Sequence, residues 1–191
     1  MPHIHTGPGE HDMTTSAYIV RMQDDEPLVL VHMHKKFGKL MQAGGHIELT
    51  ETPWATIAHE LMEETGYVLG ELSVLQPTAH RVFVENAVVH PTPFLVNTHK
   101  ISDDHYHTDL CYAFVAQSEP SALPDEGESQ DLRWLTMSEL KSAVDDGAAL
   151  EDMYQIYREI VDRGMLDYEW VHADEFTIDE PQEIGVIEKR V

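Results

Sequence analysis

The chain has 191 residues, a length that suits one domain with a sizeable hydrophobic core. Its 35 acidic and 12 basic side chains give a net charge of −23. Such a surface repels polyphosphate chains and therefore disfavours a protein that grips DNA or RNA. No apolar run approaches membrane-spanning length, and the start lacks the regions of a signal peptide. We expect a cytoplasmic protein without membrane or polymeric nucleic-acid partners.

The first third of the chain predicts a hairpin followed by a helix. Residues 14–22 and 28–32 are apolar runs separated by turn residues, which is typical of two paired strands. Thr52 is expected to cap the start of the helix, with Pro53 in its first turn. Gly66 is expected to end it.

The remaining chain alternates strand-like and helix-like segments irregularly, which predicts an α/β or α+β sandwich. We predict a domain over residues 1–163 and an acidic extension over residues 164–191, either disordered or lying as an arm on a neighbouring subunit. Apolar runs lie at residues 68–75, 81–84, 94–96 and 110–116, a short strand is expected at 132–135, a loop at 123–130, and helices at 138–144 and 152–163.

The most informative stretch is residues 44–67, which read GGHIELTETPWATIAHELMEETGY. On a helix, Glu60 and Glu64 are neighbours one turn apart, and Glu63 lies one turn from Glu60. The three are expected on the side opposite to Trp54 and Leu61. Like charges at this spacing destabilise a helix by roughly 0.2–0.5 kcal/mol per pair. A divalent cation would turn this repulsion into a set of ligands, and oxygen ligands favour Mg²⁺, with Mn²⁺ as a substitute.

This stretch resembles the Nudix box, Gly-x5-Glu-x7-Arg-Glu-U-x-Glu-Glu-x-Gly-U, in which U is a bulky apolar residue. Gly45, Glu51 and Gly66 occupy its fixed positions, as do the three glutamates, but His59 stands where the arginine belongs. The resemblance implies a mixed sheet between helices, with the box as loop–helix–loop. It also implies a hydrolase that cleaves the diphosphate linkage of a nucleoside diphosphate derivative.

The resemblance implies which residues would hold the metal and move the proton. Glu60 and Glu64 would bind the cation, Glu63 would bind it directly or through water, and the carbonyl of Gly44 would complete the site. The proton of the attacking water would go to Glu63, to Glu64 or to a glutamate of the loop at 123–130. In that loop we favour Glu128, whose alternative is an ordinary solvated acid.

His59 departs from the family pattern. The usual arginine pairs with the carboxylate that corresponds to Glu51 and braces the loop against the helix. Histidine is shorter and lacks the planar fork of arginine. We expect His59 still to hydrogen-bond Glu51, with weaker bracing when the imidazole is neutral.

Two further clusters are candidates for substrate binding. The first is the positively charged loop before the glycine pair. In so acidic a chain this loop is either an anchor for an anionic group, with an aromatic ring that stacks on a base, or solvated surface. Its residues are Lys35, Lys36, Phe37 and Lys39.

The second cluster is His105, His107 and Asp109, which occupy every other position of a strand and therefore share one side. They form either a metal site, a substrate contact or a structural cluster.

Signatures of ADP-ribose, coenzyme A and NADH substrates are not visible, which leaves nucleoside triphosphates, including damaged ones, as favoured substrates. An alternative is an enzyme similar to isopentenyl-diphosphate isomerase, but that chemistry needs an active-site cysteine, and Cys111 lies in an apolar strand. Another is a non-catalytic nucleotide sensor, although such domains commonly lose the box glutamates. The sequence leaves the oligomeric state open, and the resemblance makes a homodimer one candidate because Nudix domains often dimerise.

Overall fold

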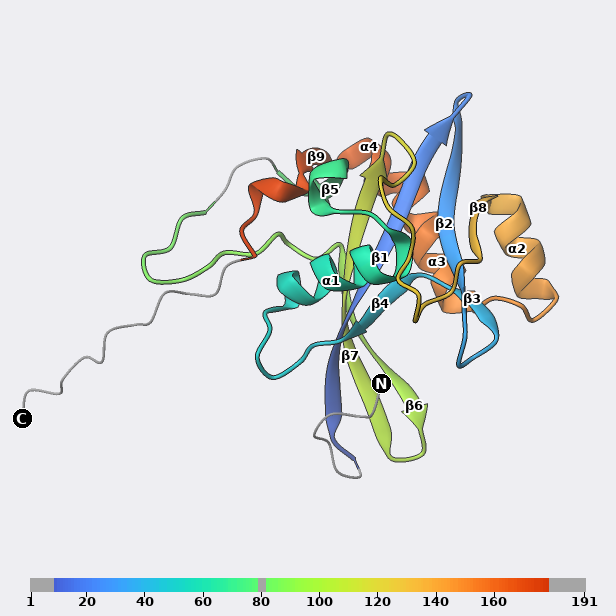
Figure 1. The fold of residues 1–191 in the computed structure, drawn as a ribbon, viewed down its shortest axis with the longest axis horizontal. Coiled ribbons are helices and arrows are strands. Elements are labelled where there is room, and N and C mark those ends of the chain that lie inside the picture. Colours follow the sequence, from blue (N-terminus) through green and yellow to red (C-terminus); the bar gives the residue numbers. More distant parts are fainter. Residues whose placement is uncertain (1–8, 79–81, 179–191) are drawn as a thin grey trace, which may run out of the picture.

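The computed structural model describes residues 9–78 and 82–178, in which nine strands form one mixed sheet (Figure 1). The strand order is β3-β2-β1-β7-β5-β9, while β4 also pairs with β1, β6 with β7 and β8 with β2. The strands are β1 (His11–Gln23), β2 (Glu26–His34), β3 (Lys39–Met41), β4 (Ala43–His46), β5 (Leu72–Gln76), β6 (Leu95–Ser102), β7 (His105–Ala116), β8 (Leu132–Thr136) and β9 (Glu169–His172).

Helices cover both faces of the sheet, so the predicted sandwich is confirmed (Figure 1). One core lies between the sheet and α1, and the other lies between the sheet and the segment from α2 to α4. Within the described residues, no helix is long and apolar enough to cross a membrane. The helical segments are α1 (Pro53–Thr65), η1 (Leu69–Glu71), α2 (Met137–Asp145), α3 (Glu151–Glu159), the π-helical turn η2 (Ile160–Gly164), α4 (Met165–Asp167) and η3 (Ala173–Glu175).

The ends of α1 form as the sequence predicts. Thr52 caps the helix, and its side-chain oxygen accepts a hydrogen bond from the N–H of Ala55 at 3.2 Å. Gly66 ends the helix in the left-handed conformation with φ of 77°, and its N–H bonds to the carbonyl of Met62. A Cβ at position 66 would lie 2.2 Å from the carbonyl oxygen of Ala122. Glycine is therefore required there for both conformation and space.

Alternate residues of β1 enter opposite cores, because side chains along a strand point to alternate faces. Ala17 and Ile19 pack with Trp54 of α1. Tyr18 and Val20 pack on the opposite face, in the core that contains α3. β1 therefore contributes side chains to both cores.

Tyr157 anchors α3 to the sheet, because its buried hydroxyl donates to the carbonyl oxygen of Leu30. Replacing Tyr157 by Phe leaves that carbonyl without this donor, and we expect a loss of about 1–2 kcal/mol in the free energy of unfolding. Denaturant unfolding of both proteins measures the difference. Tyr154→Phe, on the same helix but not buried, is the matched control. Equal stability of the Tyr157→Phe variant and the parent would show that this hydrogen bond contributes nothing net.

The predicted extension begins at residue 164, and the structure shows that its part up to residue 178 belongs to the domain. The strand β9 pairs antiparallel with β5, and Phe176 packs against Trp54, whose ring N–H donates to the Phe176 carbonyl. Val171 is buried in the same core. The acidic residues around these few apolar positions obscured the strand pattern. The part of the predicted extension from 179 to 191 lies outside the described residues.

The apolar run predicted at residues 81–84 does not form a strand in its described part. Residues 82–84 carry no regular structure, and the Phe83 side chain is 91% exposed. Position 81, the start of that run, lies outside the described residues. The chain instead re-enters the sheet at β6, which pairs antiparallel with β7.

Candidate active site

Two glutamates of α1 face the glycine pair of β4. The N–H of Gly44 donates to Oε2 of Glu64 at 2.9 Å. A Cβ at Gly45 would lie 1.9 Å from Oε1 of Glu60, so any other residue there would have to displace this carboxylate. Glu60 and Glu64 are each only 6% exposed. The spacing of the box thus brings the loop and the helix together.

The three glutamates are expected on the helix side opposite to Trp54 and Leu61, and part of that side is covered. Glu60 and Glu64 are buried, and only Glu63 is exposed. The physical reason is the close approach of β4. Because Gly45 has no side chain, the strand covers a flank of α1 that a helix wheel assigns to solvent.

Burial shapes the electrostatics of this pair. Burial, followed by the charges of Glu63 and Glu128, raises the pKa of Glu60 to about 7. Burial and the charge of Glu60 raise the pKa of Glu64 to about 9, although the Gly44 N–H opposes the shift. Two buried carboxylates side by side are costly when both are ionised. A divalent cation between them would remove that cost, so the residues fit a metal site.

The loop between β7 and β8 brings a further carboxylate, that of Glu128, near this pair. The N–H of Asp125 donates to the carbonyl of Glu63 at 2.8 Å, which ties the loop to α1. Glu128, half-buried, follows in the same loop, and its charge contributes to the raised pKa of both Glu60 and Glu64. The structure therefore places the predicted Glu128 near the pair.

The profile of the family described as NUDIX domain matches residues 12–164, which is most of the chain. The chain belongs to the Nudix family. Membership supports a hydrolase that acts on diphosphate bonds, and Nudix enzymes generally use divalent metals. No curated protein matches the sequence significantly.

Solved structures agree with this assignment. A Nudix-family hydrolase from Clostridium perfringens is 26% identical, with a TM-score of 0.62, over 80% of this chain and 97% of that one. An Ap4A hydrolase from C. elegans matches with a TM-score of 0.58 at 13% identity, over 79% and 96% of the two chains. The E. coli dihydroneopterin triphosphate pyrophosphohydrolase matches with a TM-score of 0.54 at 14% identity, over 78% and 94%. The latter two likenesses establish the fold alone.

The Nudix box of this chain has a histidine bracing the loop. Nδ1 of His59 lies 2.7 Å from Oε1 of Glu51, as expected. The other oxygen of Glu51 accepts a hydrogen bond from the hydroxyl of Thr56 at 2.9 Å. His59 is 60% exposed, so solvent weakens the pairing, and Thr56 supplies a second support that the family pattern does not reveal.

Removal of the brace should have a moderate effect. We expect His59→Ala to lower kcat/KM for diphosphate hydrolysis by about tenfold, as is usual when a group that orients a ligand shell is lost. His59→Arg should retain or exceed the parent activity, because the planar guanidinium can donate two parallel hydrogen bonds to the carboxylate of Glu51. Steady-state kinetics of the three proteins test this, with His172→Ala, at an exposed position of β9, as the control. A large loss in His59→Arg would show that the imidazole has a role of its own.

The positive loop before the box borders the loop that carries Glu128. Nζ of Lys35 donates to the carbonyl of Gly127 at 2.6 Å. The Lys36 ammonium lies 5.6 Å from the ring centre of Phe37, which is 54% exposed. Lys39 lies on β3 and is partly buried. Lys35 is thus brought beside the site, while substrate binding by these residues remains a prediction.

Sequence reasoning missed His32 of β2. This residue is 2% exposed, and its Nε2 lies 3.8 Å from Oε2 of Glu64. Burial, with a smaller contribution from His34, lowers the pKa of His32 to about 4. A neutral imidazole therefore flanks the carboxylate pair. The available signal was a polar side chain at an inward position of an apolar strand, since buried polar groups require a reason.

His105 and His107 lie on the other face of the sheet. Cys111 follows them on β7 by an even number of residues, so its side chain points to the same face. Cys111 packs in the core that contains Tyr18 and α3, not in the core of α1. Asp109 accepts hydrogen bonds from Thr14 at 2.8 Å and from Cys111 at 3.1 Å, so it does not join the two histidines as a ligand. Contact of His105 and His107 with the substrate remains a prediction.

Proposed function

We propose that this Nudix protein hydrolyses the diphosphate linkage of a nucleoside diphosphate derivative in a reaction that requires Mg²⁺, with Mn²⁺ as a substitute. Nucleoside triphosphates, including oxidised ones, are the favoured substrates. The observation that carries the proposal is the buried pair Glu60 and Glu64 against Gly44 and Gly45, with Glu128 close enough to raise the pKa of both glutamates. Two buried carboxylates with a structural role alone would carry a large desolvation cost that no bound cation offsets.

Glu60, Glu64 and the Gly44 carbonyl would hold the cation, with Glu63 beside them or acting through a bound water. When bound, Mg²⁺ would polarise the phosphorus–oxygen bonds and neutralise the charge that develops on the leaving phosphate. The glycine backbone leaves space for phosphate oxygens to approach. The box therefore supplies both the ligands and the room for the diphosphate.

A carboxylate of the same group would accept the proton of the attacking water. Glu63, Glu64 and Glu128 are the candidates. Glu63 is exposed, and Glu128 is half-buried, so either can meet a water that approaches from outside. Separate glutamine variants of Glu63 and Glu128 distinguish them, because loss of the base removes the acidic limb of the pH–rate profile, whereas loss of a ligand weakens metal binding.

The lysine loop would bind the distal phosphates or the base. Lys35 is already held beside the loop of Glu128 by its bond to Gly127. In a chain of net charge −23, local positive charge near the site would offset repulsion of an anionic substrate. The exposed ring of Phe37 provides a surface on which a base stacks.

The buried Cys111 argues against an isomerase similar to isopentenyl-diphosphate isomerase. Its side chain is 0% exposed and donates to Asp109, and burial raises the pKa of the thiol well above its usual range. Such a thiol is neither a nucleophile nor an accessible acid. Glu60, Glu63 and Glu64 are all present, which argues against a domain that only senses nucleotides.

The test is hydrolysis of a substrate panel by the purified full-length protein with Mg²⁺. The panel contains nucleoside triphosphates and oxidised triphosphates. It also contains the compounds named for structurally similar proteins: diadenosine tetraphosphate, dihydroneopterin triphosphate and ADP-ribose, the last bound by the Nudix domain of Shewanella oneidensis NrtR (TM-score 0.56, 16% identity, 81% and 88% of the two chains covered). Release of phosphate, pyrophosphate or a nucleoside monophosphate supports the proposal. Tight nucleotide binding without turnover across the panel would replace it with the sensor.

A further inference from the structure

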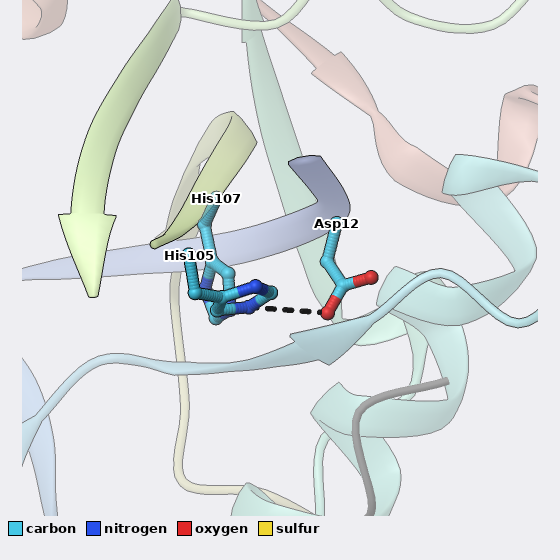
Figure 2. Close-up of side chains that lie close together, drawn as sticks. All are labelled: Asp12, His105 and His107. Carbon is cyan, nitrogen blue, oxygen red and sulfur yellow. Dashed lines mark ion pairs between the residues drawn. The ribbon is translucent and has the colours of Figure 1, made fainter. Parts of the chain in front are cut away.

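Three side chains outside the Nudix box converge on one point (Figure 2). Oδ2 of Asp12 lies 3.2 Å from Nε2 of His105. One ligand atom from each of Asp12, His105 and His107 lies within 4.8 Å of the other two. Figure 2 shows both imidazoles and the carboxylate turned toward the same space. The group combines two nitrogen donors with one oxygen donor.

The strand register brings Asp12 to two histidines that lie 93 and 95 positions later in the chain. β1 and β7 run parallel, with Asp12 beside His107. His105 lies two residues before His107 and therefore points to the same face. His46 of β4 borders the group, since its Nε2 is 3.5 Å from Oδ2 of Asp12. Two adjacent strands thus hold all three side chains in place.

The group is sheltered from solvent. Asp12 is 7% exposed, and the side chain of His105 is 13% exposed. The ring of His107 packs against the rings of His46 and His105, with ring centres 4.8 and 5.0 Å apart.

We propose that Asp12, His105 and His107 form a second metal site, specific for zinc, on the sheet face opposite the Nudix glutamates. Zn²⁺ binds imidazole nitrogen and carboxylate oxygen at about 2.0–2.2 Å in a tetrahedron, which places neighbouring ligand atoms about 3.3 Å apart. The 3.2 Å between Asp12 and His105 agrees with that spacing. Mg²⁺ prefers oxygen ligands alone, so the two sites select different ions.

Three protein ligands leave the fourth position of the tetrahedron open. Open zinc sites hold a water molecule there. His46, which already lies beside Asp12, is positioned to contact that water or to take its place after a small rotation of its ring. On β4, His46 follows Gly45 directly, and neighbouring residues of a strand point to opposite faces. His46 and Gly45 therefore face opposite sides of β4, His46 toward the proposed zinc group and Gly45 toward Glu60.

Zinc binding by the full-length protein tests the proposal. In a Glu60→Gln, Glu64→Gln background, which removes the carboxylate pair of the box, titration with Zn²⁺ against a chromogenic chelator should give one tightly bound ion per chain. His107→Gln or Asp12→Asn in that background should weaken zinc binding by at least about tenfold. His11→Gln is the matched control, because His11 precedes Asp12 but bonds to Thr108 on the other face. It should leave zinc affinity unchanged.

Cobalt substitution of the same proteins provides a second, spectroscopic readout. Co²⁺ bound to the double-glutamine protein should show the intense visible absorption of a tetrahedral site, and that absorption should be absent in His107→Gln. Circular dichroism of the metal-free variants checks that they fold. No zinc uptake by the background protein, or uptake unaffected by His107→Gln in a folded protein, would overturn the proposal. Because the box is disabled throughout, either result is independent of hydrolysis.

Discussion

Replacing Glu60 and Glu64 together by glutamine should lower the rate of diphosphate hydrolysis by roughly 10³-fold or more. Glutamine preserves the size of each side chain but removes the negative charge that would hold Mg²⁺. The N–H of Gly44 still finds an oxygen acceptor on residue 64, so the loop should keep its place. Mg²⁺-dependent turnover, measured at saturating substrate, tests this expectation.

The same double substitution should stabilise the metal-free protein. Folding raises the pKa of Glu60 and Glu64 above their ordinary values, to about 7 and about 9. The folded state therefore binds these protons more tightly than the unfolded state, and stability falls as pH rises from about 4.5 to about 9. Glutamine does not titrate, so the variant escapes this loss. We expect a gain of at least several kcal/mol at pH 9 and a much smaller one at pH 5.

Denaturant unfolding with a chelator present, at pH 5 and at pH 9, measures that difference. A variant with the exposed Glu159 and Glu169 replaced by glutamine is the matched control, because it removes the same charge far from the box. It should change neither turnover nor the pH dependence of stability. Hydrolysis at the parent rate by the Glu60→Gln, Glu64→Gln protein would place the metal site elsewhere.

The sandwich and the box followed from sequence because their signals are local. Alternation along β1 separates Ala17 from Tyr18, and each enters its own core. A cap at Thr52 and a left-handed glycine at position 66 bound α1. The spacing of the glutamates then determines which of them share a helix turn. None of these signals requires knowledge of distant contacts.

The rest depended on contacts between distant segments. The burial of Glu60 comes from the approach of Gly45, and the group around Asp12 comes from the parallel register of β1 with β7. Along the chain, Asp109 looked like the third partner of His105 and His107, but it bonds Thr14 and Cys111 instead. A sequence states which side of a strand a residue occupies, not which strand lies next to it.

The contact between Gly45 and Glu60 leads to the second large expected effect. An ideal Cβ at position 45 lies 1.9 Å from Oε1 and 2.7 Å from Cδ of Glu60. Gly45→Ala must therefore push the carboxylate away or separate β4 from α1. A displacement of about 1 Å in a catalytic ligand costs about 10²-fold in rate. We expect kcat to fall by that factor and the affinity for Mg²⁺ to fall with it.

Gly70→Ala is the control for this change. A Cβ at position 70 meets nothing nearer than 3.5 Å, from Oδ2 of Asp174, which is an ordinary contact. Its turnover and melting temperature should match those of the parent. Full activity of Gly45→Ala would mean that Glu60 tolerates a different position, and the tight approach of β4 to α1 would then not be required for hydrolysis. A folded but inactive Gly45→Ala protein would show that hydrolysis requires the close approach of Glu60 to β4, which the missing side chain at position 45 allows.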